Sequence, residues 1–185
     1  MKTYLSILRG INVGGKRIIK MDALRQLFVE LGFQNIQTYI QSGNVIFQSR
    51  KIDLEKLEQQ ITEAIGSKFN LDVPVIVKAC EELKQVIESN PFLNDQTKDT
   101  AHLHLTFLSE KPDQLHLTKI KNDLFLPDEF QIIDQVVYLY CPNSYSNSKL
   151  TNRFFETNLK TIATTRNWKT ANELLNITLK INSLH

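Results

Sequence analysis

The sequence predicts an α+β fold in which one arrangement of strands and helices occurs twice. Three observations predict it. Short apolar runs typical of strands alternate with segments of helical periodicity. The order in the first half is strand–helix–strand–strand–helix–strand, and nearly the same order returns after a polar stretch. We therefore expect two tandem ferredoxin-like subdomains (βαββαβ, alpha-beta plaits), at residues 1–93 and 94–185, the second ending in a C-terminal helix.

The first half gives the clearer pattern. Its predicted strands are the apolar runs at residues 3–9, 36–40, 44–49 and 75–77. Its helices carry apolar residues on one face: Met21, Leu24, Leu27, Phe28 and Leu31 in one, Leu54, Leu57, Ile61 and Ile65 in the next. Gly32 stands where a C-terminal cap is expected. The turn at 41–44 predicts a hairpin between the two middle strands.

A helix at about 81–89 leads into the polar run from Asn94 to Thr100, the best candidate for a linker. The predicted strands that follow lie at 102–108, 129–134, 136–141 and 161–164. Apolar residues indicate three helices here: Leu117, Ile120 and Leu124; then Leu150, Phe154 and Leu159; and finally Ala171, Leu174, Leu175, Thr178 and Ile181.

Composition narrows the class of protein. A net charge of +2 is too weak to imply nucleic acid or membrane binding, so such a partner needs a local patch. No apolar run approaches the roughly 20 residues of a membrane span, and the N-terminus does not read as a signal peptide. We expect a cytoplasmic protein without a membrane partner, with Cys80 and Cys141 as buried free thiols.

The glycine-rich stretch from Leu8 to Arg17 is the most informative one. Glycines such as Gly14 and Gly15 let backbone N–H groups turn toward one point, where an anion would bind beside Arg9 and Lys16. The stretch fits most of a phosphate loop, but Arg17 stands where that motif needs a Ser or Thr for magnesium. The alternative is that the glycines only let a strand turn into a helix. We weigh the two about equally.

A second polar stretch runs from Thr164 to Thr170. Thr170 and Glu173 have capping-box spacing, so a helix is expected to start there, although Asn167 could cap it instead. Arg166 would then lie near a helix N-terminus and attract an anion. Trp168 could stack on a base. The alternative, which is favoured because a lone tryptophan is more often a packing residue, is that Trp168 packs between the halves and Arg166 pairs with a carboxylate.

Two smaller groups complete the candidates. Ser42, Gly43 and Asn44 form a tight polar turn that hairpin chemistry alone explains. His102 and His104 alternate along a strand and share a face, a spacing that suits a metal, but the sequence supplies no convincing third ligand. We therefore predict no metal site and assign no catalytic residue.

Three stretches together resemble a known family: Leu8 to Gly15, Thr38 to Phe47, and Thr165 to Thr170. On these motifs the chain is similar to the bacterial domain-of-unknown-function family 1697 (DUF1697), nearly from end to end. The resemblance implies a pair of ferredoxin-like subdomains. It implies no activity, substrate or catalytic residue.

We hypothesise that the three polar turns converge in a cleft between the halves and bind a phosphate-bearing ligand, a nucleotide or nucleic acid. The predicted ligand-binding residues are Arg9, Asn12, Gly14, Gly15, Lys16, Ser42, Asn44, Arg166, Asn167 and Trp168. Two alternatives stay open: a small enzyme acting on an anionic metabolite, and an assembly protein with no small ligand. The sequence assigns no cofactor and no oligomeric state.

Overall fold

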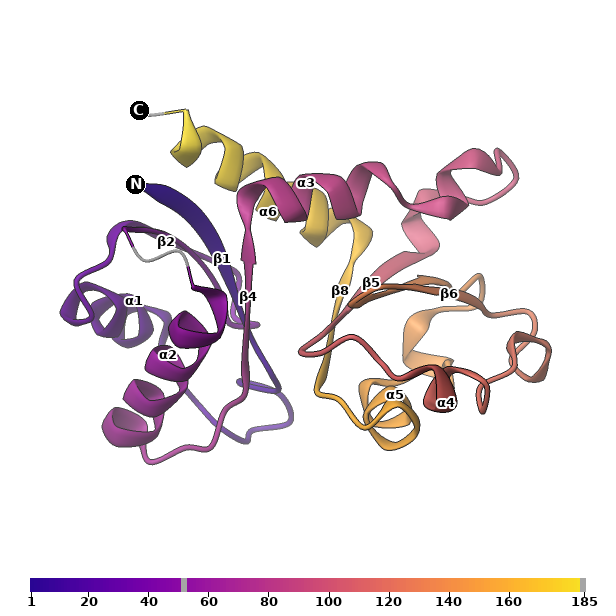
Figure 1. Cartoon of the computed structure of the whole chain (residues 1–185), viewed down its shortest axis with the longest axis horizontal. Helices are drawn as coiled ribbons and strands as arrows, with labels where there is room; N and C mark the ends of the chain where they lie inside the picture. The colour runs from indigo at the N-terminus through magenta and orange to yellow at the C-terminus, as the bar shows by residue number, and fades with distance from the viewer. Residues whose placement is uncertain (51–52, 184–185) are drawn as a thin grey trace. The chain divides into compact units, whose positions relative to one another are not determined.

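Two four-stranded antiparallel sheets with their helices make up the chain, which confirms the α+β class (Figure 1). The structure is a computed structural model that describes residues 1–50 and 53–183. By its internal contacts the chain divides into two compact units. Unit 1 comprises Met1–Gln85 and Glu173–His185, and unit 2 comprises Val86–Asn172.

Unit 1 contains the first sheet, with the strand order β2-β3-β1-β4. Its elements are β1 (Lys2–Leu8), α1 (Met21–Glu30), β2 (Gln34–Tyr39), β3 (Asn44–Ser49), α2 (Leu54–Phe69) and β4 (Val75–Ala79). Gly32 follows the end of helix α1 as expected, and its φ of +81° is the left-handed conformation that glycine adopts without strain. The predicted hairpin is the β2–β3 pair, in which Tyr39 lies opposite Asn44.

Helices α1 and α2 cover one face of this sheet. Tyr4, Leu8 and Phe47 point from the strands into a buried cluster that also holds Phe28 of α1 and Ile61 of α2. The ring of Phe47 lies 5.3 Å from that of Phe28, in an edge-to-face arrangement that aromatic pairs prefer. The two helices can cover this face because their apolar residues recur at helical spacing and so lie on one side of each helix.

The opposite face of the first sheet is also buried. Leu5 and Ile46 are fully inaccessible there. The C-terminal part of helix α6 (Trp168–Asn182) reaches this face, because Gln48 Nε2 donates to the Ile181 carbonyl at 3.3 Å and Thr3 Oγ1 donates to Asn182 Oδ1 at 3.0 Å. This is why the end of the chain belongs to unit 1.

Unit 2 repeats the order, with strands β6-β7-β5-β8. Its elements are β5 (Leu103–Leu108), α4 (Gln114–Leu117), β6 (Glu129–Ile133), β7 (Val136–Tyr140), α5 (Asn152–Leu159) and β8 (Ala163–Asn167). Leu108, Phe130 and Leu139 pack against Phe155 of α5 in a second core. The expected helix through Leu124 is interrupted: α4 has one turn, and a separate 3₁₀ turn spans Asn122–Leu124.

The unit boundaries differ from the division expected between residues 93 and 94. One falls within helix α3 (Cys80–Glu88) and the other within α6. The polar run 94–100 is held on the second sheet, since the Lys98 ammonium lies 4.4 Å from the centre of the Tyr140 ring and pairs with Glu129. Residues 1–93 and 94–185 as folding domains stay a prediction.

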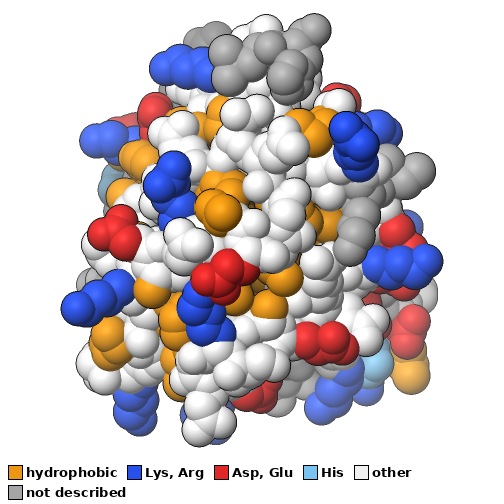
Figure 2. Space-filling view, turned by 90° about the vertical axis from the view of Figure 1, so that its left-hand side faces the viewer, with side chains coloured by type: hydrophobic (Ala, Val, Ile, Leu, Met, Phe, Trp, Pro, Cys, Tyr) orange, Lys and Arg blue, Asp and Glu red, His pale blue; other side chains and the backbone are white. Residues whose placement is uncertain are grey.

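Figure 2 shows one face, on which Lys and Arg side chains are interspersed with Asp and Glu instead of forming one patch. Among the helices in the described ranges, none has the length and apolar character to cross a membrane.

Candidate functional site

The glycine loop of unit 1 closes on itself as a tight hairpin. Lys16 N–H donates to the Val13 carbonyl at 3.1 Å, and Asn12 N–H donates to the Arg17 carbonyl at 3.2 Å. Gly14 and Gly15 have φ values of +59° and +72°, which a turn of this kind requires. Two loop amides are therefore used within the loop, while the Lys16 side chain is exposed at its tip.

The side chain of Asn12 fastens this loop to its surroundings. Its Nδ2 donates to the carbonyls of Ile19 and Gln41, each at 2.9 Å, and its Oδ1 accepts the Ile19 N–H at 2.9 Å. These bonds occupy both donor hydrogens and one acceptor lone pair of the amide. Asn12 thus has a structural role in holding the loop in place, and a role in ligand binding stays a prediction.

The turn at Ser42, Gly43 and Asn44 is likewise built from internal bonds. The buried Asn44 donates from Nδ2 to the Tyr39 carbonyl at 3.1 Å and to Ser42 Oγ at 2.9 Å. Gly43 has a φ of +76°, and a Cβ there would lie 2.7 Å from Leu8 Cβ. The turn therefore requires glycine at this position.

In unit 2 strand β8 runs directly into helix α6. Asn167 is the last residue of the strand and the N-cap of the helix, because its Oδ1 accepts the Thr170 N–H at 2.8 Å. The expected start of the helix at Thr170, with a Thr170–Glu173 capping box, is wrong, and the alternative cap is correct. No residue separates the two elements, because β8 ends at Asn167, opposite His104 of β5, and α6 begins at Trp168.

Arg166 lies within the sheet and is not at the helix terminus. It is buried opposite Leu105, and its Nη1 donates to Thr164 Oγ1 at 3.0 Å and to the Thr165 carbonyl at 2.8 Å. The guanidinium of Arg166 thus has hydrogen-bond partners within the protein. Its part in binding a ligand stays a prediction.

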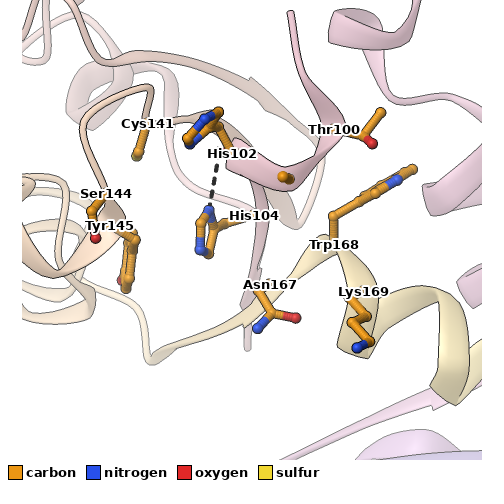
Figure 3. A pocket seen from close by; sticks show the side chains of 10 residues that line it. Thr100, His102, His104, Cys141, Ser144, Tyr145, Asn167, Trp168 and Lys169 are labelled. Carbon is orange, nitrogen blue, oxygen red and sulfur yellow. Dashed lines mark hydrogen bonds between the residues drawn. The ribbon is translucent and has the colours of Figure 1, made fainter.

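A pocket of about 540 Å³ opens beside the start of α6 in unit 2 (Figure 3). Ligand pockets commonly have volumes of this order. The pocket is lined by Thr100, Ala101, His102, His104, Cys141, Ser144, Tyr145, Asn167, Trp168 and Lys169. In the view of Figure 3, His104 lies centrally, Tyr145 lies on one side of it, and Trp168 extends from the other side toward Thr100.

One wall of the pocket is a stacked pair of rings. The imidazole of His104 lies 4.7 Å from the Tyr145 ring, with 23° between the planes. His104 Nδ1 is 3.2 Å from the His102 carbonyl oxygen, which only accepts, so Nδ1 carries the hydrogen. Burial lowers the pKa of His104 below its usual range, which keeps the ring neutral at pH 7.

The other wall is cationic. Asn167, Trp168 and Lys169 are the N-cap and the first two residues of α6, and all three line the pocket. The first N–H groups of a helix have no partner within the helix, and the helix dipole favours negative charge there. With the ammonium of the exposed Lys169 beside it, this terminus suits a phosphate or carboxylate.

The sulfur in the pocket is not a nucleophile at neutral pH. Burial, with a smaller contribution from the charge of Asp128, raises the pKa of the Cys141 thiol to about 11, so the thiolate that reacts is scarce. Cys80 and Cys141 are both buried free thiols, as expected. Within residues 1–50 and 53–183 no group of three or more His, Cys, Asp and Glu side chains could hold a metal ion.

The predicted site residues fall into two groups. Arg9, Asn12, Gly14, Gly15, Lys16, Ser42 and Asn44 belong to unit 1, whereas Arg166, Asn167 and Trp168 belong to unit 2. Of the second group, Asn167 and Trp168 line the pocket. Convergence of the two groups in one cleft stays a prediction.

Sequence reasoning missed Tyr145, Ser144 and Lys169 as pocket residues. Tyr145 and Ser144 lie in the loop after β7, and no motif marks them. The alternation of His102 and His104 indicates a candidate metal ligand, and it gives no sign of this pocket. His104 lies directly opposite Asn167 in the neighbouring strand. Only an assignment of the strand register could have indicated its place beside Asn167.

The fold and the pocket define a class of protein, one with two units of α+β structure and a ligand-sized pocket in the second. The chain belongs to the family described as "Protein of unknown function (DUF1697)", whose model matches residues 1–138. The matched range ends before Thr165 to Thr170, the third of the stretches on which the resemblance rests. No curated protein matches the chain.

A solved structure of a conserved bacterial protein from Streptococcus pneumoniae is similar to this one. The TM-score is 0.74 at 23% sequence identity, and the likeness covers 96% of this chain and 98% of that chain. At this identity the likeness concerns the fold alone.

Proposed function

We propose that the protein is a binding module for a phosphate-bearing ligand, a nucleotide or nucleic acid, which the pocket of unit 2 receives. The observation that carries the proposal is the pairing of two walls in one pocket. Aromatic rings at His104 and Tyr145 offer a flat surface on which a ring can stack, and the start of α6 with Lys169 offers positive charge. A nucleotide has a flat ring at one end and an anion at the other.

We also infer that each unit is a ferredoxin-like βαββαβ plait. The support is that both sheets have the same order relative to the chain, β2-β3-β1-β4 and β6-β7-β5-β8, with helices after the first and third strand of each.

The chain has a built-in reporter for the proposed site. Trp168 is its only tryptophan and lines the pocket, so tryptophan emission, excited selectively over the five tyrosines, reports on this place alone. Titration with nucleoside 5′-monophosphates should change the emission saturably, and calorimetry gives the same affinity independently. Absence of saturable binding up to millimolar concentrations by both methods would refute the proposal.

Lys169→Ala tests the anionic end of the ligand. We expect about tenfold weaker binding, the usual cost of one charge-assisted hydrogen bond. The matched control is Lys119→Ala, which removes the same charge from an exposed position in unit 2 that does not line the pocket. Equal affinities of the two variants would place the phosphate elsewhere.

The glycine loop of unit 1 remains a proposed contact for a nucleic acid, which is longer than a single nucleotide. Lys16 and Arg17 are exposed there, and the chain has no acidic residue before Asp22. If the ligand is a nucleic acid, Lys16→Ala weakens binding of an oligonucleotide and reduces its salt dependence, while a mononucleotide is unaffected. Unchanged oligonucleotide binding would limit the site to unit 2.

A further inference from the structure

The ring of His104 carries a hydrogen-bond acceptor that none of the residues described by the structure uses. Since Nδ1 donates to the His102 carbonyl at 3.2 Å, a neutral ring has a bare lone pair on Nε2. Within residues 1–50 and 53–183, Nε2 has no hydrogen-bond partner. His104 lines the pocket and is half-buried, so the pocket is where a partner could approach it.

Neighbouring side chains fix the orientation of the His104 ring and so the direction in which its Nε2 points. Tyr145, which stacks on the imidazole, donates from its hydroxyl to Thr165 Oγ1 at 3.1 Å. Thr165 in turn donates to Asn152 Oδ1 at 2.6 Å, and its Oγ1 lies 2.7 Å from Thr106 Oγ1. The network connects β5, β8, α5 and the loop after β7. A side chain locked by its neighbours holds its acceptor in place before a ligand arrives.

The bare lone pair also orients the ligand. A phosphate oxygen is itself an acceptor, so it is repelled at Nε2 and belongs at the other wall, beside Lys169 and the first amides of α6. The group that faces Nε2 must therefore donate a hydrogen, and the exocyclic amino group of the base is the donor of a nucleotide that lies farthest from the phosphate.

We infer that His104 determines specificity in the proposed pocket: its Nε2 accepts a hydrogen bond from the exocyclic amino group of a nucleobase. The inference rests on the proposed function. The pocket would then prefer adenine over hypoxanthine and cytosine over uracil, because the keto oxygen of the second base in each pair would meet an acceptor with an acceptor. Buried polar groups left unpaired are what make such discrimination strong.

Two matched pairs of probes test the inference: adenosine against inosine 5′-monophosphate, and cytidine against uridine 5′-monophosphate. With the unmodified protein, we expect the amino-bearing member of at least one pair to bind about tenfold more tightly. In His104→Phe, which keeps a ring against Tyr145 but removes Nε2, the two members should bind within about twofold of each other. His116→Phe, outside the pocket, should keep the preference.

A second measurement avoids any substitution in the stack. Nitrogen-15 NMR of the histidine rings distinguishes a protonated from a bare ring nitrogen. We expect Nδ1 of His104 protonated and Nε2 bare at pH 7.5, with the Nε2 resonance moving when the preferred nucleotide is added. A protonated Nε2 in the free protein, or an unmoved resonance under saturation, would overturn the inference.

The possible failures are distinguishable. If no nucleotide binds, the proposed function and this inference fall together. If nucleotides bind and Lys169→Ala weakens them, but the members of both pairs bind equally or the preference survives in His104→Phe, only the role of His104 is wrong.

Discussion

Asn167 caps helix α6 through a 2.8 Å hydrogen bond that its Oδ1 accepts from the N–H of Thr170. The same residue ends strand β8 and lines the pocket. The cap thus fixes where the first turn of α6 begins, and with it the position of Lys169 in the pocket wall.

Loss of this cap should cost stability. Asn167→Ala is expected to lower the free energy of unfolding by about 1 kcal/mol, measured by urea denaturation. Asn167→Asp should keep the cap and the stability, yet weaken a phosphate ligand, because it puts a negative charge beside Lys169. Thr151→Ala, which removes the cap of α5 at Phe154 N–H, is the control: it should lower stability without changing affinity. An Asn167→Asp variant with full affinity would argue against an anion at this terminus.

Asn12 should matter more for stability than for a ligand. Asn12→Ala removes three hydrogen bonds and leaves both polar groups of Ile19 and the Gln41 carbonyl without this partner. We expect a loss of about 2 kcal/mol in the free energy of unfolding. Gln41→Ala changes an exposed side chain in the same region and should cost little. A stable Asn12→Ala protein with impaired ligand binding would return Asn12 to the binding site.

Two glycines with similar backbone angles should respond differently to alanine. Gly43 has a φ of +76°, and its Cβ would meet Leu8 and Ile11 atoms at 2.7–2.9 Å. Gly14 has a φ of +59° with nothing within 4 Å of such a Cβ. Gly14→Ala should therefore cost only the strain of the left-handed conformation, about 1–2 kcal/mol, and Gly43→Ala should cost more. Thermal unfolding of both variants gives the comparison, and a smaller loss for Gly43→Ala would contradict the packing seen around β1.

The features predicted correctly from sequence are those that local chemistry decides. Gly32 after helix α1 and the polar turn around Gly43 each need a left-handed residue, and glycine at these places indicates the turn by itself. The alternation of strands and helices was equally readable, because each half repeats one order.

The features missed are those that depend on strand pairing. Thr170 and Glu173 have the right spacing for a cap, but β8 pairs with β5 as far as Asn167 and runs directly into α6, whose first turn Asn167 caps. In the sequence Arg166 stands beside an expected helix terminus. In the structure it belongs to strand β8 and is buried. No spacing in the sequence relates His104 to Tyr145, whose stacking follows from the fold.

Both cysteines should be unreactive in the native protein. Cys80 and Cys141 are buried, and burial raises the pKa of each thiol. We expect an aromatic disulfide reagent at pH 7.5 to label neither thiol over the time in which it labels both in denaturant. A ligand that fills the pocket should slow any residual labelling of Cys141 but not of Cys80. Fast labelling of Cys141 without denaturant would show that its thiol is open to the pocket.

Stability should fall in mild acid because of His104. Burial, reinforced by the charge of His102, lowers the pKa of His104 below its ordinary value of 6.5, and the bond to the His102 carbonyl only partly offsets this. The unfolded chain takes up a proton at the ordinary pKa, whereas the folded chain does so only at lower pH. The unfolded state thus binds more protons in the interval between these two values.

The contribution of His104 is therefore complete above pH 6.5 and decreases as the pH falls through that interval. Urea denaturation at pH 7.5 and 5.5 should show a smaller loss in His104→Phe than in the unmodified protein. His102, Cys141, Tyr145 and Lys169 are the other titratable groups lining the pocket, and His102 is the second histidine among them. His102→Gln is accordingly the control, expected to keep most of the acid loss. An equal loss in His104→Phe and the unmodified protein would mean that His104 is as easily protonated in the folded chain as in the unfolded one.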